Sequence, residues 1–213
     1  MAKALLRTAD GAVDIAMFGR MLADKLDFNR DAAVQVAHAF TTDAVEIEDD
    51  YYTAVDDLKT SAEDAGAGFV GEAGFGAGVY YLYVCVDCEL LVKNLGGDRA
   101  LAARGIEALV RALATASPSG KRNSFGNHVR AEFILAKKGD AQPRSLAGAF
   151  TTPVSAGDQL EKSIEHLLDK RKAFAAAYGE DWSDERRLHV GDTKAATLAE
   201  IATFAAADLG GKP

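Results

Sequence analysis

The sequence predicts a mixed fold of the α+β or α/β class. Two observations carry this prediction. Stretches of alternating, β-branched or aromatic residues are typical of strands, and other stretches repeat apolar residues at helical spacing. The two kinds of stretch interleave along the chain. Its 213 residues suffice for one large domain or two small ones with a core of their own.

The first third of the chain predicts two strands and a short helix. Residues 13–22 mix β-branched with other apolar residues, and residues 33–42 alternate Val34 and Val36 with other side chains, so each stretch favours a strand. Residues 49–58 open with two aspartates, which the helix dipole favours in a first turn. Apolar residues then share one face at helical spacing, which predicts a helix.

The middle of the chain predicts a loop, a strand, a helix and a second strand. Residues 65–78 hold six glycines in fourteen residues, which predicts a mobile or tightly turned loop. Residues 79–86 (VYYLYVCV) are aromatic and β-branched and predict a strand. Residues 98–115 carry one apolar stripe and predict a helix, and residues 131–137 (AEFILAK) predict a strand.

Two helices are predicted towards the C-terminus. Residues 158–178 have leucine and isoleucine in helical register. Asp158 with Glu161 resembles a capping box, and Gly179 is placed to end this helix. Residues 193–209 predict the last helix, which a glycine pair terminates.

Composition describes an ordinary globular protein with an acidic balance. Hydrophobic residues make up 48% of the chain, and the formal net charge is −8. Proteins that bind a phosphate backbone usually carry a basic balance, so charge alone argues against nucleic acid. No apolar run approaches the roughly 20 residues of a membrane helix, and the N-terminus does not read as a secretion signal. A cytoplasmic location without membrane association is therefore expected.

Five segments of the chain form a family pattern. In order they read VDIAMFGRML from Val13, VAHAFTTDAV from Val36, DDYYTAVDDL from Asp49, GFVGEAGFGAGVYYLYV from Gly68 and SPSGKRNSF from Ser117. Together they resemble the CasC family, the repeated backbone subunit of type I-E Cascade, which is a CRISPR RNA-guided surveillance complex. The resemblance runs to about residue 133 and continues more weakly to the end. Family members carry a long region before the first segment, where this chain has the leader MAKALLRTADGA.

The resemblance implies an α+β fold: a partial RRM-like (ferredoxin-like) palm with a thumb loop, lacking the N-terminal strand, helix and most of the fingers. Residues 1–30 would be a remnant of the finger region. Residues 31–213 would form the palm, with a thumb insertion at about residues 44–76. A sheet that lacks a partner strand exposes unpaired backbone edges, which favours pairing with another chain.

The resemblance also implies a function, namely an RNA-binding structural subunit that coats guide RNA in antiviral defence. The implied partners are CRISPR guide RNA, other copies of the backbone subunit, other Cascade subunits and, through the guide, target DNA. A truncated backbone homologue that acts as a decoy or cap and blocks Cascade assembly is an alternative, and so is an inactive gene fragment. An unrelated α+β enzyme is disfavoured, because the sequence shows no Ser-His-Asp order, G-x-S-x-G motif or P-loop.

The turn after the predicted helix 98–115 offers candidate RNA ligands. Lys121, Arg122, Asn123 and Ser124 place two cations beside amide and hydroxyl donors, which suits contact with a phosphate or a 2′-hydroxyl. The resemblance places them in the family's proline-glycine-lysine loop, close to the guide RNA. The alternative interpretation is a solvated turn.

Two further pairs of candidates follow from the resemblance. Arg20 and Met21 match finger residues next to RNA, where a methionine can wedge against a splayed base. The alternative is a core Met21 and a surface ion pair for Arg20. Phe69 and Val70 match the thumb, with Val70 at the apolar tip that inserts between bases. The alternative is a Phe69 that folds onto the domain.

Neither a cofactor nor a metal is expected, and no residue is assigned a catalytic role, so the chain is predicted not to be an enzyme. Acidic residues between positions 46 and 64 lack the order of a calcium loop and favour a solvated or neighbour-facing face. Cys85 and Cys88 form a lone CxxC without the further ligands that zinc needs. They are predicted to be plain reduced cysteines, with redox and metal roles left open.

Overall fold

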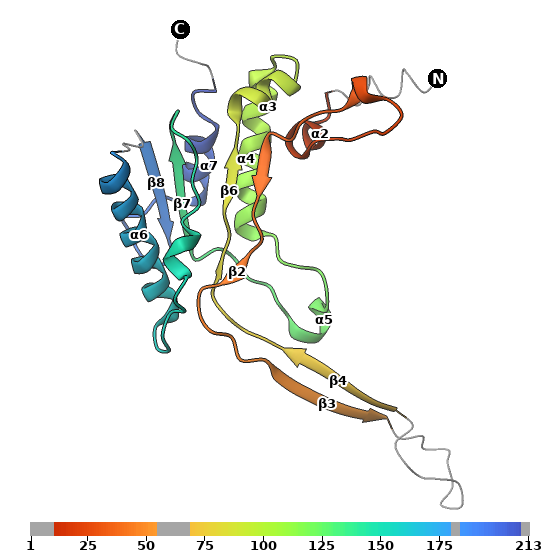
Figure 1. Cartoon of the computed structure of the whole chain (residues 1–213), viewed down its shortest axis with the longest axis vertical. Helices are drawn as coiled ribbons and strands as arrows, with labels where there is room; N and C mark the ends of the chain where they lie inside the picture. The colour runs from red at the N-terminus through yellow and green to blue at the C-terminus, as the bar shows by residue number, and fades with distance from the viewer. Residues whose placement is uncertain (1–10, 55–68, 180–183, 210–213) are drawn as a thin grey trace, which may run out of the picture. The chain divides into compact units, whose positions relative to one another are not determined.

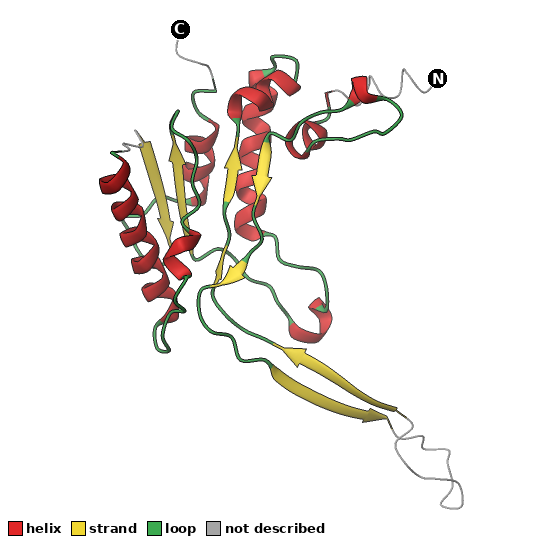
Figure 2. Ribbon diagram, in the orientation of Figure 1, coloured by secondary structure: helices red, strands yellow, loops and turns green. Residues whose placement is uncertain are grey.

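The computed structural model describes residues 11–54, 69–179 and 184–209, and it confirms a mixed α+β fold (Figures 1 and 2). Helices alternate with short strands that pair two by two. The chain forms two compact units. Unit 1 takes Met1–Ala37, Tyr83–Arg144 and Phe174–Pro213, and unit 2 takes His38–Leu82 and Ser145–Ala173.

Unit 1 combines helices with two antiparallel strand pairs. Its described elements are α2 (Val13–Phe18), η2 (Leu26–Phe28), β1 (Val34–Val36), β6 (Val84–Val86), α3 (Cys88–Asn94), α4 (Arg99–Thr115), α5 (Arg122–Phe125), β7 (Phe133–Lys138), β8 (Asp184–His189) and α7 (Leu198–Ala206). β1 pairs with β6, with Val34 opposite Val86. β7 pairs with β8, with Phe133 opposite His189.

The core of unit 1 joins α2, β1, α3, α4 and α7. Leu91 of α3 is fully buried at its centre. Gly105 of α4 lets α2 approach closely, since a Cβ at that position would lie 2.8 Å from Met17 Cε and 2.9 Å from Val13 Cγ1. The position of α2 therefore depends on the absence of a side chain at residue 105.

Side-chain caps set where the long helices of unit 1 begin. Asp98 Oδ1 accepts a hydrogen bond from the Leu101 N–H (2.8 Å), which starts α4 at Arg99. Thr197 and Glu200 form a capping box at the start of α7. The hydrogen bonds that Thr197 donates lower the pKa of the Glu200 carboxyl.

Unit 2 contains a long hairpin and a small polar and aromatic core. Its described elements are β2 (Phe40–Thr41), β3 (Glu48–Ala54), β4 (Phe69–Phe75), β5 (Tyr80–Tyr81), η3 (Ala147–Phe150) and α6 (Gln159–Tyr178), whose last residues belong to unit 1. The buried hydroxyls of Thr42 and Ser163 lie 2.8 Å apart. Buried Asp43 accepts from the Val79 N–H (3.1 Å), so the core satisfies its polar groups internally.

The strand predicted over residues 13–22 is wrong, because Val13–Phe18 form helix α2. The sequence of this segment is apolar at adjacent positions and fits either structure. Packing decides the outcome. As a helix, the segment directs Val13 and Met17 towards Gly105 of α4 and buries Met17.

The helix predicted over residues 49–58 is wrong where the structure describes it, because Glu48–Ala54 form strand β3. The loop predicted over residues 65–78 is also wrong in part, because Phe69–Phe75 form its partner β4. Tyr52 lies opposite Gly71, so an aromatic strand residue faces a glycine. The remaining residues of both predictions, 55–58 and 65–68, lie outside the described residues.

Other predictions hold with adjusted ends. The helices predicted over 98–115 and 158–178 match α4 and α6, and Gly179 adopts a φ of 63° where α6 ends. The predicted strand 131–137 matches β7. The strands predicted over 33–42 and 79–86 are each broken into two short strands, and the helix predicted over 193–209 is shortened to α7. No prediction covered α3 or β8.

Among the described residues, no helix combines the length and the apolar character needed to cross a membrane.

Candidate nucleic-acid interface

The candidate interface is the loop of residues 117–130, which follows α4 in unit 1 (Figure 1). The base of this loop is closed. The Ser117 hydroxyl donates to the Val129 carbonyl oxygen (3.1 Å) and accepts from the Val129 N–H (3.2 Å). Asn127 Nδ2 donates to the Pro118 carbonyl oxygen (3.4 Å). The ends of the loop are therefore tied together by its own polar groups.

The single turn of α5 forms the apex of the loop. Lys121 before it has a φ of 50°, and Gly126 after it has a φ of 60°, both in the left-handed region. A left-handed residue at each end changes the direction of the backbone, so the helical turn does not continue into the chain before or after it. The exposed side chains of Lys121, Asn123, Ser124 and Phe125 thus lie together at one end of the loop.

The structure distributes the predicted ligands of this loop between two roles. Lys121, Asn123 and Ser124 are exposed. Arg122 is half-buried, and its Nη2 donates to the carbonyl oxygens of Ser117 (3.0 Å) and Pro118 (3.5 Å). The guanidinium of Arg122 therefore braces the loop from inside, while its neighbours face solvent, where RNA contact remains a prediction.

Two exposed residues of the loop were not singled out from the sequence. Phe125 keeps 44% of its surface exposed, and Lys121 Nζ lies 5.8 Å from the centroid of its ring. Arg130 is also exposed. The signal for Phe125 is its position four residues after Lys121, because one helical turn brings such residues onto one face.

The charge of this loop is opposite in sign to that of the whole chain. Residues 117–130 contain Lys121, Arg122 and Arg130 and no acidic residue, whereas the chain carries −8. A local basic surface is what phosphate contact requires, and the distribution of charge matters more for that contact than the total.

The second pair of candidates lies in the loop of residues 19–30, also in unit 1. Arg20 Nε and Nη2 donate to the Phe28 carbonyl oxygen at 2.9 and 2.7 Å. The backbones of Arg20 and Arg30 pair in an isolated antiparallel bridge, which closes the loop. Met21 is 88% exposed, so the structure does not place it in the core. It presents the apolar side chain that wedging against a base requires, whereas Arg20 holds the loop together.

The third pair lies on the hairpin of unit 2. Val70 of β4 pairs with Thr53 of β3 and is 63% exposed, and Phe69 pairs with Ala54 through the backbone.

The hairpin region also carries acidic residues. Residues 46 and 48–50 are acidic and exposed. The acidic residues for which a solvated or neighbour-facing face was predicted are therefore exposed wherever the structure describes them, and the choice between the two stays a prediction.

A family profile described as CT1975-like protein matches residues 1–209. The chain belongs to the CT1975-like family. No curated protein matches it. Two solved structures of similar proteins are described as a CRISPR RNA-guided surveillance complex in a pre-nicking state and a CRISPR RNA-guided surveillance complex. The first has 27% identity and a TM-score of 0.81 over 97% of this chain and 58% of that chain. The second has 29% identity and a TM-score of 0.73 over 93% of this chain and 75% of that chain.

The CT1975-like chain thus spans less than two thirds of the first of these subunits. Its α+β fold of antiparallel strands and helices fits an RRM-like palm.

Within unit 1 the two candidate loops attach to different parts of α4. α2, which leads into the loop of residues 19–30, packs at Gly105, whereas the loop of residues 117–130 follows the C-terminus of α4 at Thr115.

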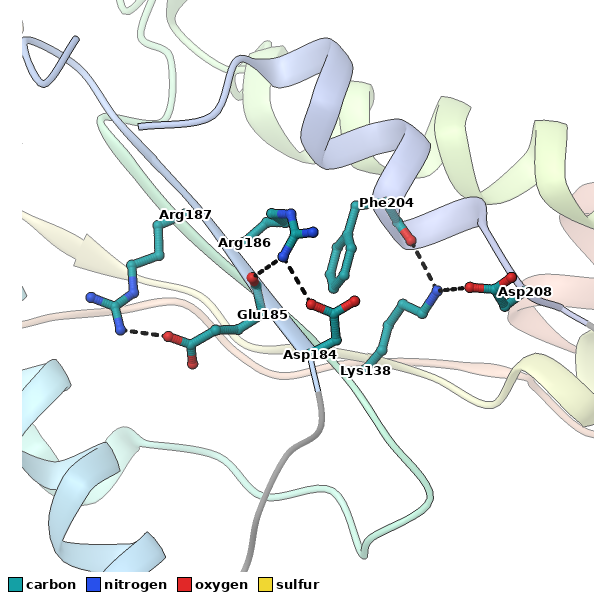
Figure 3. A network of polar contacts seen from close by, with 7 residues as sticks. All are labelled: Lys138, Asp184, Glu185, Arg186, Arg187, Phe204 and Asp208. Carbon is teal, nitrogen blue, oxygen red and sulfur yellow. Dashed lines mark hydrogen bonds and ion pairs between the residues drawn. The ribbon is translucent and has the colours of Figure 1, made fainter. Parts of the chain in front are cut away.

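A second cluster of charges in this CT1975-like chain is structural. Figure 3 shows Lys138 of β7 directed at the end of α7, where its Nζ donates to the carbonyl oxygen of Phe204 (3.2 Å). The same Nζ also donates to the Ala207 carbonyl oxygen (2.8 Å). The Arg186 guanidinium lies 5.1 Å from the centroid of the Phe204 ring and bonds Asp184 at 2.8 Å. These cations fasten α7 to the β7–β8 pair, and a cation is stabilising at a helix C-terminus.

The cysteine pair of the CT1975-like chain lies where β6 leads into α3. Cys85 and Cys88 are both free thiols. Burial, followed by the charge of Asp87, raises the pKa of the Cys88 thiol. A reactive thiol needs a lowered pKa, so this direction favours the plain reduced cysteines predicted from the sequence.

Arg122→Ala is expected to loosen the loop of residues 117–130. The change removes the part-buried hydrogen bond from Arg122 Nη2 to the Ser117 carbonyl oxygen, and a hydrogen bond from a charged donor contributes about 1.5–3 kcal/mol where it is shielded from water. The longer bond to the Pro118 carbonyl oxygen is exposed and adds less. Amide hydrogen exchange should quicken in this loop. Lys121→Ala removes a neighbouring cation without removing these bonds and is the control. Equal exchange in both variants would contradict the bracing role.

Proposed function

We propose that this chain is an RNA-binding structural subunit of the Cascade backbone of a type I-E CRISPR system, and that it coats guide RNA in antiviral defence. Support comes from the similarity to subunits of CRISPR RNA-guided surveillance complexes over nearly the whole chain. The segments that resemble the CasC family support the subtype. The observation that carries the proposal is the braced, locally basic loop of residues 117–130, with exposed Lys121, Asn123 and Ser124.

The proposed mechanism is binding without chemistry. Lys121 meets a phosphate oxygen, and the amide and hydroxyl of Asn123 and Ser124 reach phosphate or 2′-hydroxyl groups. Contacts of this kind carry no sequence information. Recognition of target DNA then comes from base pairing with the guide, and the chain is not an enzyme.

The proposed partners are guide RNA, other copies of the backbone subunit and the remaining Cascade subunits. Identical copies that contact one another head to tail build an open helix, which is the geometry needed to follow a strand of RNA. The acidic residues of the hairpin repel phosphate, so we assign the hairpin's exposed acidic face to protein contact in this assembly.

Lys121→Ala is expected to weaken binding of single-stranded RNA and to flatten its dependence on salt. Each lost phosphate contact on a single strand lowers the slope of log affinity against log salt by about 0.7. The basic loop should give measurable RNA binding by the wild-type chain at low salt. Because the whole chain has a net charge of −8, this binding should be weak and should vanish near physiological salt. Fluorescence anisotropy with a labelled oligonucleotide over a salt series measures both quantities.

Lys93→Ala is the matched control, since it removes the same charge from an exposed position on α3. If Lys121→Ala and Lys93→Ala give the same slope, Lys121 belongs to a solvated turn. A wild-type chain that binds no RNA even at low salt would contradict the proposed function itself.

A further inference from the structure

We propose that Phe125 is a base-stacking residue for single-stranded RNA, with one unpaired base lying against its ring and Lys121 meeting the adjoining phosphate. This inference rests on the proposed function and names the contact that the loop of residues 117–130 makes. It adds an aromatic side chain to the ligands that the sequence indicated in this loop.

The position of Phe125 supports a contact with a planar ligand. Its ring is 44% exposed at the end of α5, on a loop whose other exposed side chains are mostly polar. Val129, the other large apolar side chain of the loop that is exposed (63%), lies at the base of the loop and not beside Phe125. Removing apolar surface from water lowers the free energy, and every nucleobase has a planar face that can stack on an aromatic ring.

The cation beside the ring supports a nucleotide over a purely apolar ligand. Lys121 Nζ lies 5.8 Å from the ring centroid of Phe125. A nucleotide carries its phosphate close to its base, so a cation at this position can meet the phosphate of a base stacked on the ring. Aromatic platforms flanked by positive charge are the usual means of binding single strands without reading their sequence.

The rigidity of the loop supports binding by a preformed surface. Hydrogen bonds from Arg122 to Ser117 and Pro118, and between Ser117 and Val129, hold the loop at its base. Phe125 has only two side-chain torsions to order. A platform braced in this way loses little conformational entropy when a base stacks on it.

The experiment compares Phe125→Leu with Phe125→Tyr in the full chain, at low salt, by anisotropy. The probes are an oligouridine and an abasic oligomer of equal length and charge. Wild type and Phe125→Tyr should prefer the oligouridine by about 5- to 140-fold, because stacking on an aromatic contributes that factor per base. Phe125→Leu keeps the apolar bulk and should bind both probes equally.

The outcomes separate the inference from the function on which it rests. If wild type and Phe125→Leu bind oligouridine alike, and both prefer it to the abasic oligomer, RNA binding stands and the role of Phe125 is overturned. Irradiation of a 5-iodouridine oligomer with wild-type chain should give a cross-linked peptide containing Phe125. A cross-link confined to other peptides also overturns the role. A wild-type chain that binds neither probe overturns the proposed function and this inference with it.

Discussion

Replacing Leu91 by alanine is expected to lower the free energy of unfolding by about 2–5 kcal/mol, the range for removing a leucine side chain from a packed core. Leu91 is 0% exposed in α3, and the core around it joins α2, β1, α4 and α7. Elements from well-separated parts of the sequence meet there. The cavity therefore weakens several contacts at once, which places the loss towards the upper part of this range.

Denaturant unfolding of the purified chain measures this loss as a lower midpoint at unchanged slope. Leu26→Ala is the matched control, because the same atoms are removed from a side chain that is 71% exposed in the loop of residues 19–30. That variant should stay within about 0.5 kcal/mol of wild type. Similar losses in both variants would show that Leu91 does not occupy the core of a cooperative unit.

Gly19→Ala is expected to open the loop that carries Arg20 and Met21. Gly19 has φ 81° and ψ 172°, a conformation that costs other residues about 1–3 kcal/mol. A Cβ there would also lie 2.9 Å from the Arg30 carbonyl oxygen and 3.2 Å from the Ala32 nitrogen. Both atoms belong to the backbone and cannot swing away. The backbone bridge between Arg20 and Arg30 must therefore break.

Amide hydrogen exchange across residues 19–30, together with the thermal midpoint, measures this effect. Gly96→Ala is the control. Gly96 also has a positive φ, 66°, but a Cβ there would meet nothing within 4 Å, so its substitution introduces backbone strain without collision. Gly19→Ala should lose exchange protection where Gly96→Ala keeps it. Protection retained in Gly19→Ala would contradict the close approach of the two backbones.

The candidate residues of the loop 117–130 show how far sequence reasoning reached. Residue type was enough to indicate a site, since lysine beside asparagine and serine offers phosphate and hydroxyl contacts. It was not enough to separate Lys121, which is exposed, from Arg122, whose guanidinium turns inward to two carbonyl oxygens. Lys121 and Arg122 are adjacent cations that the sequence does not distinguish. Their side chains point in different directions because Lys121 has a left-handed backbone conformation and Arg122 begins the helical turn of α5.

The elements whose apolar residues form a clear pattern along the chain were predictable. α4 and α6 repeat apolar residues over many turns, and β7 is a short apolar run, so local preference and burial agree there. Segments whose local signals conflict took their structure from long-range packing. α2 is helical because Gly105 leaves room for it, and β3 is a strand because β4 pairs with it across two glycines. Those contacts join residues far apart in the chain, and a pattern read along the chain contains no information about which distant residue will lie opposite.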